Sequence, residues 1–317
     1  MRKYITSITE AIGNTPLLRL DRLAAELELD GEIYAKLEHM NPSFSKKDRI
    51  ALGMIEMAER KGLLKPGQPV LEVTSGNTGT SVALVCAAKG YRFICCMSRG
   101  NSIERVKMIQ AFGGELVLVD QAPGSVKGKV SNDDLVLVEQ EAERIINETG
   151  AYFLNQFNNL DNSAAQEAAA EEMWEQSEGK LDAFADFIGT GGTFGGYARA
   201  LKAHNPAIRC YAIEPEGCAY YAGNIVPGAT HSIQGCGYAK HVENVDRKYI
   251  DGCIAVNDEE SIKMVGKLAA IEGIFSGFSS GANVAAVVKL INGVEKGSKI
   301  GVVINDCGLK YMSTTLF

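Results

Sequence analysis

The stretch Val70-Leu71-Glu72-Val73-Thr74-Ser75-Gly76-Asn77-Thr78-Gly79 contains the pattern that decides the fold. Its mostly apolar start is typical of a short buried strand, and the polar residues that follow begin a helix that continues to Gly90. The same order comes again, with an apolar run at 93–97, a helical pattern at 103–112 and another apolar run at 115–119. Short apolar strands that alternate with helices predict parallel βαβ units and a doubly wound sheet.

The second half of the chain shows the same alternation. Apolar runs at 152–154, 183–188, 210–213, 253–256 and 300–304 predict strands, and helical patterns lie around them at 162–176, 193–203, 258–272 and 281–291. We therefore expect an α/β protein with two lobes, each a twisted, mostly parallel sheet flanked by helices.

Composition narrows the class of protein. The 317 residues suffice for two domains, and 46% apolar with 22% charged residues is ordinary for a soluble globular protein. A net charge of −7 disfavours nucleic acid or an anionic membrane as the main partner. The sequence has no run of 18 apolar residues, so we expect no membrane span. It also has no apolar segment behind the N-terminus, so we expect no signal peptide and a cytoplasmic location. The eight cysteines form no CxxC pair, which argues against a metal site and for reduced thiols.

Lys47 lies in the stretch Asn41 to Arg49, where an apolar strand gives way to a helix. An amine at a helix N-terminus can be desolvated and held neutral, and only a neutral amine forms a Schiff base with a carbonyl group. Taken alone, this lysine is more simply an ordinary solvated charge, so the hypothesis depends on the other motifs.

Two glycine-flanked loops are candidate anion sites. Thr74 to Gly79 places hydroxyls and free backbone N–H groups at a helix start, which suits a carboxylate better than a plain capping turn does. Gly189 to Thr193 can hold a phosphate with backbone donors. It is neither a Walker A loop nor a GxGxxG fingerprint, because no Gly-Lys-Ser/Thr follows and Phe194 stands where the third glycine is required.

A third junction, Ser276 to Asn283, reads alone as a helix cap. Combined with the lysine, the carboxylate loop and the phosphate loop, it completes what an enzyme needs to hold pyridoxal 5'-phosphate on a lysine beside an amino acid. Motifs that match a known family stand in order at Gly13-Asn14-Thr15-Pro16-Leu17, Asn41-Pro42-Ser43-Phe44-Ser45 through Lys47, Thr74 to Gly79, Asn155-Gln156-Phe157, Gly189 to Thr193, His231 to Gly237, Ser279-Ser280-Gly281 and Tyr311-Met312-Ser313-Thr314. With them the chain resembles the cysteine synthase / cystathionine β-synthase family of fold-type II pyridoxal-phosphate enzymes, and most of all the O-acetylserine sulfhydrylases.

The resemblance implies a tryptophan-synthase-β-like fold and a role for each motif. An N-terminal lobe of residues 38–153 would hold the Schiff-base lysine and the carboxylate loop, and residues 1–37 with 154–317 would form the other lobe. The implied catalytic and cofactor-binding residues are Lys47 (Schiff base and base for the Cα proton), Asn77 (ring hydroxyl), Gly189, Thr190, Gly191, Gly192 and Thr193 (phosphate) and Ser279 (pyridine nitrogen). The implied substrate residues are Thr74, Ser75, Thr78 and Gln156 for the carboxylate, and Gly235 in the loop over the site. No metal is implied.

The implied reaction is β-replacement, in which O-acetyl-L-serine and sulfide give L-cysteine and acetate through an α-aminoacrylate. Alternatives with the same first half-reaction are cysteine breakdown with sulfide release and the synthesis of cystathionine, lanthionine or a diaminopropionate-type product. A serine/threonine dehydratase fits the motifs poorly, and a cofactor-binding relic would have lost Lys47 or the 74–78 loop. Among partners, the family implies a homodimer and allows a serine acetyltransferase tail.

The chain departs from the family pattern at four places, which are Lys46, Ser232, the stretch Ile233 to Lys240 and the stretch Cys307 to Tyr311. Lys46 stands directly before Lys47, and we assign the Schiff base to Lys47 because Asp48-Arg49 follows it. The stretch Ile233 to Lys240 differs from the usual Ile-Gln-Gly-Ile-Gly-Ala-Gly-Phe, which leaves the choice of nucleophile open. Cys236 in that stretch is more simply a packed small residue than a reactive thiol.

Overall fold

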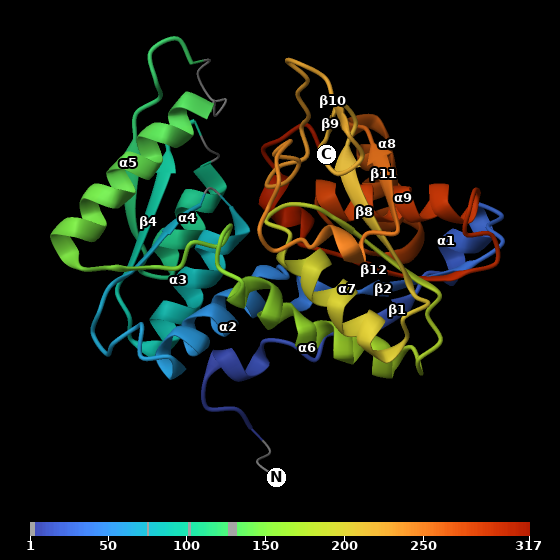
Figure 1. The fold of residues 1–317 in the computed structure, drawn as a ribbon, viewed down its shortest axis with the longest axis horizontal. Helices are drawn as coiled ribbons and strands as arrows, with labels where there is room; N and C mark the ends of the chain where they lie inside the picture. The colour runs from blue at the N-terminus through green and yellow to red at the C-terminus, as the bar shows by residue number, and fades with distance from the viewer. Residues whose placement is uncertain (1–3, 75, 101–102, 126–131) are drawn as a thin grey trace. The chain divides into compact units, whose positions relative to one another are not determined.

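The computed structural model describes residues 4–74, 76–100, 103–125 and 132–317. The chain divides into two compact units, the first made of Met1–Ile12 and Lys47–Asp161, the second of Gly13–Lys46 and Asn162–Phe317. Each unit contains a sheet of its own (Figure 1). The functional lobe boundaries expected from the resemblance, 38–153 against 1–37 with 154–317, stay a prediction.

The first unit is built on a four-stranded parallel sheet of order β5-β4-β3-β6. Its strands are β3 (Val70–Val73), β4 (Phe93–Ser98), β5 (Glu115–Val119) and β6 (Tyr152–Phe153), and its helices are η1 (Ile8–Ala11), α2 (Lys47–Arg60), α3 (Asn77–Lys89), α4 (Ile103–Ala111) and α5 (Asn132–Thr149).

Both faces of this sheet are covered. Alternate residues of a strand point to opposite faces, so Cys95 belongs to the core formed with α2 and α3, whereas Ile94 belongs to the core formed with α5. Strands buried on both faces need near-continuous apolar runs. This requirement explains the sequence of β4, in which every residue is buried.

The second unit is built on a six-stranded sheet of order β1-β2-β12-β7-β8-β11, antiparallel only between β1 and β2. Its strands are β1 (Leu17–Arg19), β2 (Glu32–Lys36), β7 (Ala183–Phe187), β8 (Arg209–Pro215), β11 (Gly252–Val256) and β12 (Lys299–Val303), with a separate pair of β9 (Cys218–Ala219) and β10 (Asn224–Ile225). Its helices are α1 (Asp21–Glu26), η2 (Glu38–Met40), α6 (Asp161–Gln176, whose first residue closes the first unit), α7 (Gly192–His204), η3 (Arg247–Tyr249), α8 (Asp258–Lys267), η4 (Leu268–Glu272, a π-helical turn), α9 (Phe278–Ile291) and η5 (Gly308–Tyr311).

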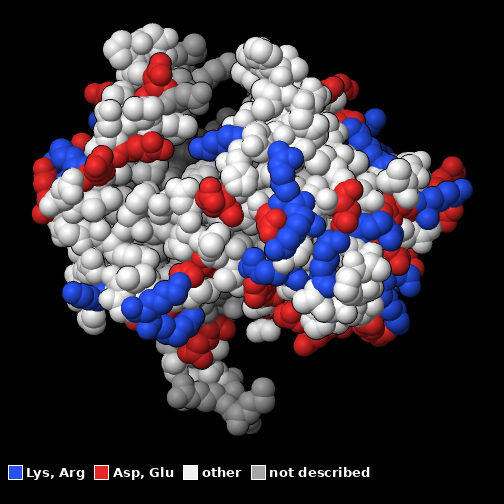
Figure 2. Space-filling view, in the orientation of Figure 1, with Lys and Arg blue, Asp and Glu red and all other residues white. Residues whose placement is uncertain are grey.

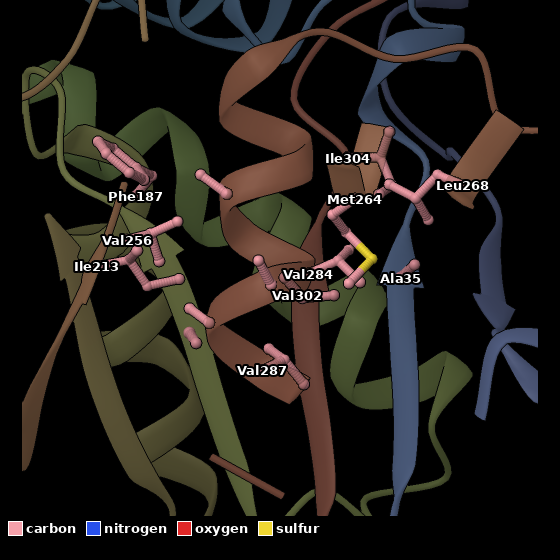
Figure 3. Close-up of a cluster of buried hydrophobic side chains, with 14 of the residues drawn as sticks. Ala35, Phe187, Ile213, Val256, Met264, Leu268, Val284, Val287, Val302 and Ile304 are labelled. Atoms are coloured by element: carbon pink, nitrogen blue, oxygen red, sulfur yellow. The ribbon is translucent and has the colours of Figure 1, made fainter. Parts of the chain in front are cut away.

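Helix α9 is fixed against this sheet by its apolar face. One buried cluster contains Val284 and Val287 of α9 together with Val302 of β12, Ile213 of β8 and Ala35 of β2 (Figure 3). Because the helix is packed along its length, its first turn, which contains Ser279, is held in a defined place over the sheet.

The α/β class expected from the sequence is confirmed, and most elements lie within a few residues of their expected bounds. Helix α2 begins at Lys47, so the candidate lysine is its first residue, and the short helix α1 was not predicted. In the described part of the chain, no helix combines the length and apolar character that a membrane crossing requires. Acidic and basic side chains are interspersed on the face drawn in Figure 2.

Candidate functional site

The two adjacent lysines have different surroundings. The Lys46 ammonium lies 3.0 and 3.1 Å from the two carboxylate oxygens of Asp186 on β7, and both side chains are buried. Asn283 of α9 donates to the same carboxylate over 2.9 Å. The Lys46 amine cannot leave this ion pair without stranding a buried carboxylate. Lys46 therefore has a structural partner, which favours Lys47 as the residue that binds a carbonyl group.

The carboxylate loop lies between β3 and α3 in the first unit. Thr78 in the first turn of α3 donates from Oγ1 to Gln156 Oε1 over 2.7 Å, and the backbone N–H of Gly76 donates to Thr74 Oγ1 over 3.3 Å. Asn77 is the first residue of α3. The structure thus brings Thr74, Thr78 and Gln156 together at a helix N-terminus, where backbone N–H groups favour an anion. Ser75 lies outside the described residues.

A buried carboxyl group that the sequence motifs did not identify, that of Glu72, accepts a hydrogen bond from Gln156 beside this loop. Glu72 on β3 is 1% exposed, and its Oε2 accepts the backbone N–H of Gln156 over 3.3 Å. Burial raises the pKa of Glu72 to about 8, although hydrogen bonds from Gln156 and Val73 act in the opposite direction. The only signal in the sequence is an acidic residue inside an apolar strand, which requires a hydrogen-bond partner.

The phosphate loop follows β7 and begins α7 in the second unit. Gly191 has a φ of +81°, which favours glycine, and Asn162 donates to Thr190 Oγ1 over 3.1 Å. A Cβ at Gly192 would lie 1.9 Å from Asn162 Oδ1, and one at Gly189 would lie 2.7 Å from Gly235 O. The loop can therefore have no side chains at these positions, and Gly192 and Thr193 form the helix start, where backbone N–H groups are available to an anion.

Ser279 lies in the first turn of α9, and its Oγ accepts a hydrogen bond of 3.0 Å from Asn305 Nδ2. Asn305 comes two residues after β12 and is 4% exposed. Asn305 could not be identified from the sequence, because no local pattern links it to a residue 26 positions away.

The loop that departs from the family pattern is packed against the phosphate loop. The backbone N–H of Gly237 donates to Ile188 O over 3.1 Å, and Gly235 has a φ of +79°. Cys236 is 7% exposed and its thiol donates to Ile233 O, as expected of a packed small residue. The change in sequence therefore lies beside the phosphate loop, within the second unit.

Comparisons with known proteins agree over almost the whole chain. A family model described as pyridoxal-phosphate dependent enzyme matches residues 8–306. A cysteine synthase of Staphylococcus aureus is 38% identical over 320 residues, which covers 100% of this chain and 98% of the relative. A solved O-acetyl serine sulfhydrylase, isoform 3 of Entamoeba histolytica, has a TM-score of 0.91 at 33% identity, covering 100% of this chain and 93% of that one. A hydrogen sulfide-producing enzyme of Fusobacterium nucleatum has a TM-score of 0.89 at 33% identity, covering 98% and 99%.

Proposed function

Because the chain belongs to the family of pyridoxal-phosphate dependent enzymes, we propose that it catalyses β-replacement on an activated L-serine. The proposed substrates are O-acetyl-L-serine and sulfide, and the products are L-cysteine and acetate. The observation that carries the proposal is the full-length similarity to a cysteine synthase. The anion-binding geometry of the 74–78 loop with Gln156 supports it, because this reaction needs a site for an amino-acid carboxylate.

The residues present fit the cofactor. A glycine-lined helix start at 189–193 suits a phosphate, since a Cβ at Gly189 or Gly192 would collide with neighbouring atoms. We assign the ring hydroxyl to Asn77, the ring nitrogen to Ser279 and the covalent attachment to the Lys47 amine. When bound, pyridoxal phosphate supplies an electron-withdrawing ring that stabilises negative charge on the substrate Cα.

The protein's own groups then have separate tasks. Thr74, Ser75, Thr78 and Gln156 bind and orient the substrate carboxylate. Lys47 Nζ takes the Cα proton, a contribution of ~10²–10⁴-fold for a well-placed base. The neutral Ser279 hydroxyl, unlike a carboxylate, does not hold a proton on the ring nitrogen. With its ring nitrogen unprotonated, the bound cofactor would supply a weaker electron sink, and this would favour direct loss of the β-substituent.

A second candidate function keeps the first half of this reaction and changes the donor or the nucleophile. Examples are sulfide release from L-cysteine and the formation of cystathionine, lanthionine or a diaminopropionate-type product. Two observations favour this second candidate function. The loop at Gly235 to Lys240, which departs from the family pattern, is packed against the phosphate loop. One similar structure is that of a hydrogen sulfide-producing enzyme.

The test is spectroscopic. The purified protein is expected to show the visible absorption of lysine-bound pyridoxal phosphate, which Lys47→Ala abolishes. Lys61→Ala, which changes an exposed lysine just beyond the end of the same helix, is the control and keeps it. O-acetyl-L-serine is then expected to change the spectrum and sulfide to restore it with release of L-cysteine. Absence of the band refutes the cofactor assignment, and a stronger response to L-cysteine or L-serine selects the second candidate.

Three further proposals follow from the family. The protein acts as a homodimer, which light scattering measures directly. It resides in the cytoplasm, which fractionation of cells tests. Its site accepts the C-terminal tail of a serine acetyltransferase, and a synthetic tail peptide that fails to compete with O-acetyl-L-serine contradicts this.

A further inference from the structure

Asn305 connects two of the candidate motifs within the second unit. Its backbone N–H donates to Ser280 Oγ over 2.9 Å, and its carbonyl accepts the backbone N–H of Lys46, the residue before Lys47, over 2.9 Å. Its side-chain Nδ2 donates to Ser279 Oγ over 3.0 Å. The two backbone bonds hold Asn305 in place, so the side chain is directed at Ser279 by the fold.

The direction of the side-chain bond decides what Ser279 can do. A serine hydroxyl has one proton to donate and two lone pairs that accept. Because Ser279 Oγ accepts from Nδ2, its proton remains for another acceptor. A pyridine nitrogen without a proton is an acceptor, whereas a protonated one is a donor and would compete for the same oxygen lone pairs.

Among the described residues, the other half of the Asn305 amide makes no contact that would account for an asparagine at this position. Its Oδ1 is buried and has no hydrogen-bond partner within the part of the chain that the structure describes. A buried acceptor left unsatisfied lowers stability. The side-chain hydrogen bond that Asn305 makes goes to Ser279, which indicates that its amide acts on the Ser279 hydroxyl.

We propose that Asn305 is a positioning residue: its amide fixes the Ser279 hydroxyl as a hydrogen-bond donor, and Ser279 therefore binds the cofactor's ring nitrogen in its unprotonated form. This inference rests on the proposed function, in which Ser279 faces that nitrogen. It adds a residue that acts through Ser279 and does not itself touch substrate.

The experiment uses the holoenzyme loaded with pyridoxal phosphate labelled with ¹⁵N in the ring. Asn305→Asp replaces the amide by a carboxylate of the same shape that only accepts when ionised, so it draws the Ser279 proton toward itself. We expect the ring ¹⁵N signal to move toward the protonated position. Asn305→Ala keeps both backbone bonds and removes the donor, and we expect kcat to fall about fivefold to tenfold, the value of one neutral hydrogen bond, with KM within about twofold.

A double-mutant cycle distinguishes positioning from general structure. In the Ser279→Ala background, Asn305→Ala is expected to have no further effect on kcat, because its target is gone. Asn292→Ala, at the exposed opposite end of α9, is the matched control and changes neither the signal nor kcat.

Two results overturn the inference: a ring signal in Asn305→Asp identical to that of the unmodified protein, or effects of Asn305→Ala and Ser279→Ala that multiply in the double variant. If Asn305→Ala does not fold, the isosteric Asn305→Asp still decides through the ring signal. An unmodified protein that binds no pyridoxal phosphate refutes the proposed function as well, and the visible spectrum shows this before any variant is made.

Discussion

Replacing the buried Glu72 with glutamine should change how stability depends on pH. Glu72 lies on β3 and is 1% exposed, and burial raises its pKa from 4.5 to about 8. Glutamine has nearly the same shape and keeps an oxygen that can accept the N–H of Gln156. It cannot ionise, so the substitution removes the titration and leaves the packing close to unchanged.

The sign follows from which state holds the proton. Between pH 4.5 and about 8, Glu72 is protonated in the folded protein and ionised in the unfolded chain. The unfolded chain binds fewer protons there, so the free energy of unfolding falls as pH rises. This interval spans about 3.5 pH units, and each unit corresponds to ~1.4 kcal/mol. By pH 8 the free energy of unfolding has therefore fallen by at most about 5 kcal/mol. Cys95 and Cys96 on β4 have pKa values that burial raises, so these thiols stay neutral in this window.

The assay is urea unfolding of the unmodified protein and Glu72→Gln at several pH values from 5 to 8. The variant is expected to gain stability relative to the unmodified protein by about 1 kcal/mol or more for each pH unit. Glu56→Gln, a half-exposed change on α2 in the same unit, controls for the loss of one carboxylate. Parallel curves for Glu72→Gln and the unmodified protein would refute the reasoning, because they would mean that Glu72 is ionised in the folded protein or does not titrate in this range.

Three other substitutions test the remaining contacts. Lys46→Met should lower the free energy of unfolding, measured in urea, by ~3–5 kcal/mol, because it leaves the buried Asp186 carboxylate without its cation. Adding Asp186→Leu should restore most of this loss. A double variant as unstable as Lys46→Met would contradict the reasoning. Gly192→Ala should weaken pyridoxal phosphate binding about tenfold or more, since its Cβ would lie 1.9 Å from a buried amide oxygen. The control is Gly266→Ala in α8, where the new Cβ meets open space. It should leave binding unchanged and raise the free energy of unfolding by ~0.5–1 kcal/mol. Thr78→Val removes the hydroxyl that donates to Gln156 and should raise KM for O-acetyl-L-serine more than it lowers kcat, as steady-state kinetics will show.

The fold could be predicted from the sequence wherever the determining pattern is local. Strand β4 is an apolar run covered on both faces, and its neighbour α3 begins at the glycine-flanked hydroxyls, so both signals lie within a few residues. Helix α1 has only six residues and no side-chain cap, and a pattern that short does not rise above its surroundings.

The supporting residues of the site could not be predicted, because their partners are distant in sequence. Glu72 meets the N–H of Gln156 across 84 positions, and Asn305 meets Ser279 across 26. A hydrogen bond between such residues has no periodicity, so nothing in either segment alone indicates it. The sequence shows only that a polar residue stands in an apolar run and needs a partner.

The pair of lysines shows what such a distant partner can decide. Lys46 and Lys47 are chemically identical and adjacent, so the sequence separates their roles only through the Asp48-Arg49 that follows Lys47. Asp186, 140 positions later, holds Lys46 in a buried ion pair. Moving this amine to a carbonyl carbon would leave the buried carboxylate without its cation. The carboxylate on β7 therefore gives Lys46 a structural role, and this supports the assignment of cofactor binding to Lys47.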